Sequence, residues 1–372
     1  MGVDPGKPIQ LGAALKYAAL DPDNKGGPSY GHYLELDPVF ATLKDTADAA
    51  VAGLWSNDNW DMFRAAWRVP GPLPADCPQP VTDVSESYQT IPMRDGAEIE
   101  IKIMTSTKNE NKNTSTERQG NVCVLRMHGG GWAFGWHGSE AVENLHAANH
   151  PNVVLVSIDY RLAPEHRYPT PLNDCVDTLK WVKANAASLN INAEKIVLLG
   201  DSSGSNLYLA LALKARDENI SGIIAMMLDW PNGCHPMFHQ KPRDEQGFEL
   251  ESFVQNHNAS VIDANVLEFC WDAYVPDAQP DPYHSPLLAD SFKGLPPAFI
   301  QIAGYDPIRD EGLAISEKLK KDGVATETHV YKGLPHCFSI LFGDLHQSKQ
   351  FQEQQNTFLA KTVKAANEGK PE

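Results

Sequence analysis

The chain has 372 residues, of which 42% are hydrophobic and 21% are charged, so it holds enough apolar material for a large core. At roughly 100–200 residues per domain, this length fits one large globular body with a lid, or two to three domains, and the composition excludes a disordered or fibrous chain. The net charge of −17 argues against a nucleic-acid partner or an anionic membrane, because an acidic surface repels phosphate groups.

The N-terminus and the lack of a long apolar run predict a cytoplasmic protein. The N-terminus lacks a basic stretch followed by an apolar core, and no run approaches the roughly 18 apolar residues of a membrane span. The six cysteines are scattered, without a C-x-x-C pair or a short cluster with histidine. We therefore expect free buried thiols, and neither a disulfide framework nor a metal site.

The N-terminal part of the chain predicts helices. They are expected over residues 38–52 and 59–68, where aromatic side chains recur at helical spacing: Trp55, Trp60, Phe63 and Trp67. A Val-Pro-Gly-Pro-Leu-Pro run then ends the helical pattern. The aromatic stripe is most simply a packing face, and a lid that faces the substrate is the alternative.

From residue 85 the period changes to two, which predicts strands over 88–93 and 98–104 in a β-hairpin, followed by a surface loop over 105–120. Short apolar runs then alternate with helical patterns, at 122–127, 153–158, 196–199, 223–228 and 298–302. This βαβ alternation predicts an α/β fold, with a mostly parallel sheet covered by helices on both faces.

About seventy residues between Leu228 and Ala298 interrupt this alternation, and a loop of that length is uncommon in a compact domain. We expect an inserted lid, with a helix over 250–274. The sequence predicts four segments: an N-terminal helical cap segment at 1–84, the first part of the core at 85–228, an inserted cap segment at 229–290 and the second part of the core at 291–372.

A candidate nucleophile lies where one predicted strand turns into a helix. The strand ending at Leu199 runs into Gly200-Asp-Ser-Ser-Gly204, a G-x-S-x-G pattern with Ser202 at its centre, and a helical pattern follows. The three-residue motif is weak alone, and its strand and helix context carries the assignment. Glycines fit the sharp turn, and the helix N-terminus directs amides and a positive dipole end toward a developing oxyanion.

The strand at 122–127 ends in His128-Gly-Gly-Gly-Trp132, the HGGG motif that supplies oxyanion-hole amides in lipases and esterases. Consecutive glycines let the backbone approach a substrate carbonyl closely. The expected donors are the amides of Gly130, Gly131 and Ser203. A glycine-rich turn without this role is the alternative.

When the serine lies in a turn of this type, its catalytic partners follow it along the chain in the order Asp or Glu, then His. Asp306 follows the strand at 298–302, whereas Asp310 comes one helical turn later and is expected to complement a helix dipole. The favoured base is His336, in the loop after the last predicted strand. Two other histidines compete, one inside that strand and one near a helix start: His329 and His346.

These residues predict acyl transfer. His336 takes the proton of Ser202, the serine oxygen attacks an ester carbonyl, and Asp306 orients the imidazole and stabilises the imidazolium. Water then hydrolyses the acyl-enzyme. An acyltransferase or a lactone-processing hydrolase would need the same three residues, so both stay alternatives.

Five segments together resemble the hormone-sensitive-lipase-like group of α/β-hydrolase esterases: His128-Gly-Gly-Gly-Trp132, residues 159–165 (DYRLAPE), Gly200-Asp-Ser-Ser-Gly-Ser-Asn206, residues 306–312 (DPIRDEG) and His336-Cys-Phe338. The resemblance implies an eight-stranded α/β-hydrolase core with a helical cap, and hydrolysis of short- to medium-chain carboxylic esters without a cofactor. It also supports Ser202, Asp306 and His336 as a triad, and implies a structural role for 159–165.

Three departures from that family concern the site. Many members have Ala and Gly where this chain has Ser203 and Ser205, and Gly where it has Cys337, which makes substrate preference harder to carry over. Plant gibberellin receptors resemble the same family but lack the catalytic histidine, so the presence of His336 disfavours a non-catalytic receptor. The expected partner is a small neutral ester, and the sequence leaves open whether the chain forms a homodimer.

Overall fold

The computed structural model describes residues 3–12, 16, 30–56, 59–69, 71–109 and 120–369. One eight-stranded sheet runs through the molecule in the order β1-β2-β4-β3-β5-β6-β7-β8. The strands are β1 (Val84–Pro92), β2 (Glu98–Ser106), β3 (Asn121–Met127), β4 (Val153–Ile158), β5 (Ile191–Asp201), β6 (Ile223–Asp229), β7 (Ala298–Tyr305) and β8 (Thr326–Pro335). β2 is antiparallel to both of its neighbours, and the other pairs are parallel, which confirms the predicted mostly parallel sheet.

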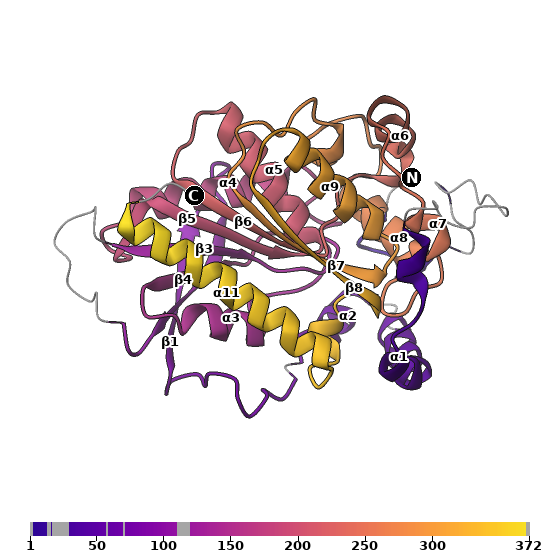
Figure 1. Cartoon of the computed structure of the whole chain (residues 1–372), viewed down its shortest axis with the longest axis horizontal. Coiled ribbons are helices and arrows are strands. Elements are labelled where there is room, and N and C mark those ends of the chain that lie inside the picture. Colours follow the sequence, from indigo (N-terminus) through magenta and orange to yellow (C-terminus); the bar gives the residue numbers. More distant parts are fainter. Residues whose placement is uncertain are drawn as a thin grey trace.

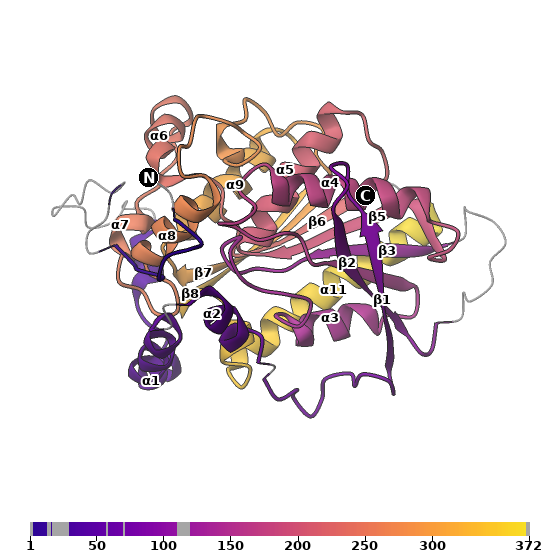
Figure 2. The same cartoon turned by 180° about the vertical axis from the view of Figure 1, so that it is seen from behind.

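Helices cover both faces of this sheet (Figures 1 and 2). The longer ones are α1 (Pro38–Trp55), α2 (Trp60–Trp67), α3 (Ala141–Ala148), α4 (Thr170–Ala184), α5 (Ser203–Asp217), α6 (Gln240–Gln246), α8 (Ala264–Tyr274), α9 (Arg309–Lys321) and α11 (His346–Glu368). Short helical turns are η1 (Gly31–Leu34), η3 (Pro236–Phe238), α7 (Ser252–Gln255), η4 (Pro286–Leu288) and α10 (Phe338–Leu341). α3 and α11 pack on one face, and α4, α5 and α9 pack on the other.

The central strands are hydrophobic because they are enclosed on both sides. Every residue of β3 and of β4 is buried. A parallel strand between two helical layers has no solvent face, so its sequence shows a continuous apolar run in place of an alternating one. This is the physical reason why the short apolar runs in the sequence identified the core strands.

The carboxyl ends of the core strands meet along one edge of the sheet. The paired residues at these ends are Met127 with Gly200, Asp201 with Asp229, and Tyr305 with Pro335. The loops that follow β3, β5, β6, β7 and β8 therefore begin side by side. In an open parallel sheet this edge is where ligands bind.

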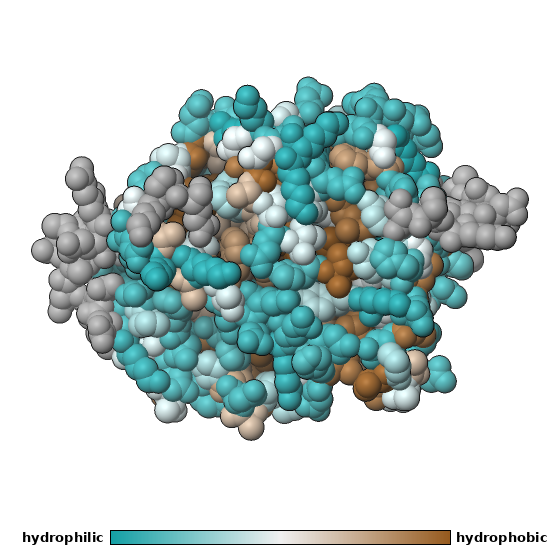
Figure 3. Space-filling model, viewed as in Figure 1, coloured by the Kyte–Doolittle hydropathy of each residue, from teal (hydrophilic) through white to brown (hydrophobic). Residues whose placement is uncertain are grey.

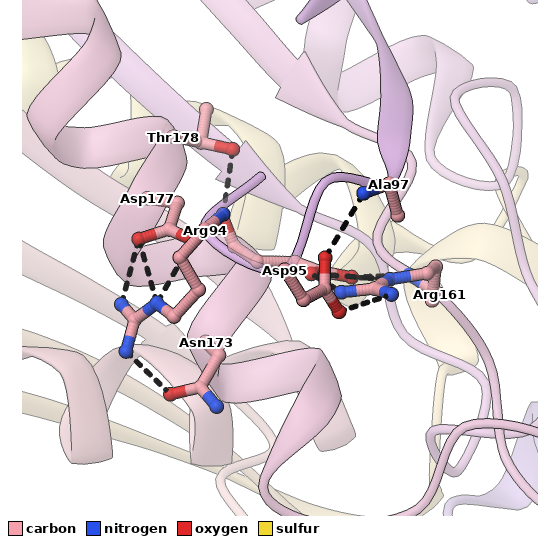
Figure 4. A network of polar contacts seen from close by, with 8 residues as sticks. Arg94, Asp95, Ala97, Arg161, Asn173, Asp177 and Thr178 are labelled. Carbon is pink, nitrogen blue, oxygen red and sulfur yellow. Dashed lines mark hydrogen bonds and ion pairs between the residues drawn. The ribbon is translucent and has the colours of Figure 1, made fainter. Parts of the chain in front are cut away.

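The turn of the β1–β2 hairpin is anchored to α4 (Figure 4). Arg94 donates from Nη2 to Asp177 (2.7 Å) and from Nη1 to Asn173 (3.0 Å), and the neighbouring Asp95 accepts from Arg161 (2.8 Å). The predicted hairpin is thus confirmed, with longer strands than expected. Thr105 and Ser106 were assigned to a loop but belong to β2, because they pair with the start of β1. The segment 110–119 of that loop lies outside the described residues.

The two segments assigned to a cap come together at the carboxyl edge. Both views place α1, α2, α7 and α8 at the end toward which β7 and β8 run. Phe269 of α8 packs on Trp55 and Trp60 at ring-centroid distances of 5.7 Å each. The aromatic stripe of the N-terminal helices is therefore a packing face in these contacts.

The expected helix over 250–274 was wrong as a single element. α7 ends at Gln255, and α8 begins after Asp263, whose side chain accepts a hydrogen bond from the Val266 amide (2.8 Å). Between them, Asn256 donates from Nδ2 to the backbone oxygen of Asp306 (2.8 Å). Polar residues that bind backbone groups compete with the helix, so this segment turns instead of continuing.

Figure 3 shows a largely hydrophilic face, with hydrophobic areas in the half of the view that holds α1. Helix α1 buries only Phe40 and leaves Val39 and Leu43 57% and 38% exposed. Among the described helices, none has the length and the hydrophobicity that a membrane crossing needs.

Candidate active site

Ser202 lies in the sharp turn between β5 and α5. Its φ of 52° and ψ of −117° fall in a region that residues with a side chain rarely occupy. Backbone hydrogen bonds hold this turn, because the Ser202 N–H donates to Asp229 O (2.8 Å) and the Asn206 N–H donates to Ser202 O (3.1 Å). The predicted strand, turn and helix around this serine are all present.

The two glycines of the motif are required by their neighbours. A Cβ atom on Gly200 would lie 2.5 Å from the ring of Tyr208, and one on Gly204 would lie 2.4 Å from Met127 O and 2.7 Å from His128 O. Helix α5 therefore packs directly against the end of β3. This close approach brings the start of α5, with Ser203 as its first residue, next to the HGGG loop.

Ser205 braces the same turn. Its hydroxyl donates to Asp229 O (2.9 Å) and contacts Gly200 O, which are both backbone atoms at the ends of neighbouring strands. The hydroxyl that distinguishes this chain from many relatives therefore binds backbone and does not line an open pocket, because Ser205 is fully buried.

We expect Ser205→Ala to lower the free energy of unfolding by about 1–2 kcal/mol, because it leaves buried carbonyl groups without that donor. Equilibrium urea unfolding of the two proteins measures the difference. Equal unfolding free energies would show that the hydroxyl contributes nothing to the turn.

Asp306 and His336 form a buried pair at the ends of β7 and β8. His336 Nδ1 lies 2.6 Å from Asp306 Oδ2, and the residues are 2% and 1% exposed. The other carboxylate oxygen accepts the Ile308 N–H at 3.0 Å, which fixes its orientation. With Nδ1 donating to the carboxylate, Nε2 is left as the basic nitrogen.

The competing residues lie elsewhere. Asp310 accepts the backbone N–H groups of Glu251 (2.9 Å) and Ser252 (2.8 Å), so it holds α7 against α9. His329 lies within β8 and pairs with Glu327 (2.8 Å), and His346 is the first residue of α11. Of these candidates, the structure joins Asp306 with His336.

The HGGG loop turns tightly after β3. Gly130 and Gly131 have φ values of 113° and 56°, and the Gly130 carbonyl accepts the N–H groups of Ala133 and Phe134 at 3.0 Å each. A Cβ on Gly130 would lie 2.2 Å from Phe134 O. Both glycines are thus needed for this turn, and no described hydrogen bond uses their amide groups.

A buried charge network connects the turn that holds Ser202 with the HGGG loop, and it was not predicted from the sequence. Arg126 is fully buried, and its Nη2 lies 2.7 Å from Asp201 Oδ2 and 3.5 Å from Glu140 Oε2. Glu140 in turn accepts the Gly129 N–H at 2.9 Å. The residue before Ser202 is therefore linked to the first glycine of the motif. An arginine inside an apolar strand was the available signal, since a buried charge needs partners.

The 159–165 loop braces the same region. The Tyr160 hydroxyl donates to His128 O (2.9 Å), and Arg161 pairs with Asp174 (2.6 Å) on α4. Glu165 pairs with Arg64 of α2 (2.7 Å). These contacts fit the structural role that the resemblance implies for this segment.

The described cysteines are free, and five of the six are buried. Cys337 has a φ of 54°, a conformation that suits the glycine of many relatives. Desolvation and the nearby carboxylates of Asp201 and Asp306 raise the pKa of the half-buried Cys337 thiol well above its usual range, and burial raises the pKa of the Cys270 thiol to about 12. Both thiols are therefore protonated at neutral pH and have little nucleophilic character.

Buried neutral histidines make stability depend on pH. Desolvation lowers the pKa of His137, beside the HGGG loop, to about 3, whereas an unfolded histidine titrates near pH 6.5. Below that pH the unfolded chain binds the proton more tightly than the folded chain does. The stability that the neutral side chain gives is therefore present above about pH 6.5 and is lost as the pH falls toward 3.

We expect His137→Gln to weaken this acid sensitivity. Glutamine can keep a polar contact with Ser157, which now lies 2.9 Å from His137 Nδ1, but it cannot titrate. The difference in unfolding free energy, wild type minus variant, should shrink by about 2 kcal/mol between pH 7 and pH 5. Urea unfolding at the two pH values measures it, and a pH-independent difference would contradict the prediction.

The chain matches known proteins over most of its length. A family model described as alpha/beta hydrolase fold matches residues 124–340. An AB hydrolase superfamily protein of Schizosaccharomyces pombe is 33% identical over 276 residues, which span 73% of this chain and 78% of that protein. Carboxylesterase NlhH of Mycobacterium tuberculosis is 35% identical over 211 residues, which span 55% of this chain and 62% of that protein.

A solved structure gives the same result for the fold. It comes from a structural analysis of two fungal esterases from Rhizomucor miehei, is 25% identical and superposes with a TM-score of 0.74, covering 90% of this chain and 99% of that one. The chain therefore belongs to the alpha/beta hydrolase fold family, in its hormone-sensitive-lipase-like group of esterases.

Proposed function

We propose that this carboxylic ester hydrolase is a serine esterase with Ser202 as nucleophile, His336 as general base and Asp306 as the residue that orients the base. The observation that carries the proposal is the 2.6 Å contact between His336 Nδ1 and Asp306 Oδ2 on loops that begin at the same sheet edge as the Ser202 turn. This arrangement leaves Nε2 free to accept a proton from a hydroxyl group.

In the proposed reaction, His336 Nε2 takes the Ser202 proton while the serine oxygen attacks the ester carbonyl. The amides of Gly130, Gly131 and Ser203 stabilise the tetrahedral oxyanion, and loss of one such donor typically costs about 10²–10³ in kcat. His336 then protonates the leaving alcohol. Water repeats the sequence on the acyl-enzyme and releases the acid.

The substrates we propose are neutral short- to medium-chain esters. The net charge of −17 disfavours anionic substrates near the protein.

We further propose that residues 1–84 and 229–290 form one cap over a core made of 85–228 and 291–372. The packing of Trp55 and Trp60 on Phe269 supports this proposal. We also propose that the natural ester carries, on its acyl side or on its alcohol side, a group bulkier than the acetyl group.

A panel of p-nitrophenyl esters tests this function. We expect hydrolysis of the acetate, a higher kcat/KM for the butyrate or hexanoate, and a sharp decrease for the laurate. A succinate half-ester of matched size should be a poorer substrate, because it is anionic. Inactivity on the whole panel would overturn the esterase proposal, and activity confined to acetate would overturn the proposed chain-length range.

The second step separates hydrolysis from acyl transfer. With p-nitrophenyl butyrate and added n-butanol, an esterase releases mainly butyric acid. Predominant formation of butyl butyrate at low butanol concentration would instead identify an acyltransferase, since both activities share the acyl-enzyme.

A further inference from the structure

We propose that Arg64 of α2 is a positioning residue for the reaction, because it fixes the oxyanion loop, which we define as residues 129–135. The inference rests on the proposed role of Gly130 and Gly131 in that loop. Arg64 touches no reacting group, and it acts by holding one carbonyl of the loop and the neighbouring 159–165 segment in a single arrangement.

The Arg64 guanidinium joins three parts of the chain. Its Nε donates to the Ala133 carbonyl (2.9 Å) in the oxyanion loop, and its Nη2 donates to the Ala163 carbonyl (2.8 Å). The Glu165 carboxylate accepts from Nη1 (2.9 Å) and Nη2 (2.7 Å). The Arg64 side chain is 17% exposed and that of Glu165 is 36% exposed, so the bonds to the two backbone carbonyls are better shielded from water than the ion pair with Glu165. The planar fork serves all three acceptors at once, which a lysine could not do.

The bonded carbonyl belongs to the turn that orients the glycines. The Ala133 N–H donates to Gly130 O at 3.0 Å, and the next acceptor in the loop, Trp132 O, receives the Ala163 N–H at 2.8 Å. Arg64 therefore completes a set of hydrogen bonds that fixes successive peptide units after Gly130. The directions of the Gly130 and Gly131 amides depend on those units, because consecutive peptide planes share their Cα atoms.

Packing couples α2 to the loop on its apolar side. Phe134 contacts Phe63 and Trp67 of α2 at ring-centroid distances of 5.2 Å and 4.8 Å. A tight aromatic contact transmits a shift of the helix to the loop, since protein interiors have little free volume. The Arg64 hydrogen bonds and these ring contacts thus together attach helix α2 to the oxyanion loop.

The opposite side of the loop is held by α8. Trp132 stacks on Tyr274 with ring centroids 4.5 Å apart and planes 7° apart. A Cβ on Gly131 would lie 2.3 Å from Cys270 Sγ, so α8 contacts the loop backbone directly. Because α8 holds one side of the loop, loss of the Arg64 bonds removes the polar contacts on the side that faces α2 and leaves only the ring contacts of Phe134 there. We expect the resulting shift to displace the amides proposed to hold the oxyanion.

Arg94 offers a matched control. It forms the same kind of charge-assisted fork, with Asp177 and Asn173, but it joins the β1–β2 turn to α4 and has no contact with the oxyanion loop (Figure 4). Loss of either arginine removes a structural ion pair. Only loss of Arg64 changes a loop that touches the reacting carbonyl.

The test compares Arg64→Met, Arg64→Lys and Arg94→Met by steady-state kinetics on p-nitrophenyl butyrate, after circular dichroism has confirmed the fold of each. We expect Arg64→Met to lower kcat about 10- to 100-fold with KM changed less than about threefold, because a small misplacement of stabilising groups acts on the transition state. Arg64→Lys should recover part of that loss, and Arg94→Met should keep kcat within about twofold of wild type.

Binding of n-butylboronic acid, which becomes tetrahedral on the serine oxygen, gives an independent measurement. Its inhibition constant should rise in Arg64→Met by a factor similar to the loss in kcat/KM. A folded Arg64→Met with wild-type kcat and boronate affinity would overturn the inference. If Arg64→Met does not fold, Arg64→Lys decides, because wild-type kcat in that variant also contradicts the role of the fork. Wild-type protein without esterase activity would instead refute the proposed function.

Discussion

Ser202→Ala should reduce kcat for p-nitrophenyl butyrate by about 10⁴- to 10⁶-fold, because it removes the hydroxyl on which the proposed acyl-enzyme forms. Ser202 occupies a strained backbone conformation, with φ of 52°, between β5 and α5, and such strain persists only where the surrounding structure enforces it. Alanine can occupy the same turn with the same backbone bonds. The loss should therefore appear in kcat and leave the fold intact.

Ser203→Ala is the matched control for that measurement. Ser203 is the next residue in the chain, and its proposed contribution is its backbone amide, which alanine retains. We expect kcat within about threefold of wild type, a change below about one kcal/mol. Mass spectrometry after treatment with a phosphonate inhibitor should locate the adduct on Ser202. Substantial activity in Ser202→Ala, or an adduct on another residue, would contradict the assignment of the nucleophile.

Asp306→Asn should lower kcat by about 10³- to 10⁴-fold while keeping the shape of the side chain. The carboxylate oxygen 2.6 Å from His336 Nδ1 accepts a hydrogen bond, whereas an asparagine amide can donate one. Donation by the substituted amide would favour the wrong tautomer, in which Nε2 carries the proton and cannot accept the proton of Ser202. The substitution also removes the charge that stabilises the imidazolium.

Asp310→Asn, four residues later, makes the same chemical change away from His336. Asp310 accepts the Glu251 and Ser252 amides and pairs with Arg309, so its substitution should cost stability, about 1–3 kcal/mol, with kcat per folded molecule nearly unchanged. Urea unfolding and kinetics on both variants separate the two effects. A larger kcat loss in Asp310→Asn than in Asp306→Asn would reverse the choice of acid.

The main sheet and the turn around Ser202 could be predicted because their determinants are close together in the sequence. The apolar run at 122–127 and the G-x-S-x-G pattern each describe a strand, a turn and the residues beside it. The structure adds the contacts that explain why the residues of these patterns are required. Gly204, for example, must lack a side chain because Met127 O would lie 2.4 Å from its Cβ.

Other features could not be predicted from local patterns. The helix expected over 250–274 breaks because the Asn256 side chain binds the backbone of Asp306, fifty positions away. The aromatic stripe in the first eighty residues allowed either a packing face or a lid, and its contacts with Phe134 and Phe269 are what identify the packing. Helical spacing specifies which side chains share a face but not what covers that face.

By itself the sequence determined the fold class, the candidate nucleophile and the order of its partners, because each follows from residues adjacent in the chain or from the order of strand ends. The sequence also favoured Asp306 over Asp310 as the partner of His336, and the structure places those two side chains in contact. Only the tertiary structure decided that Arg126 links Asp201 to Glu140 and that Arg64 binds the oxyanion loop. Those contacts join residues from 14 to 75 positions apart. The packing of strands and helices determines which residues meet in these contacts, and the spacing of residues along the chain does not predict that packing.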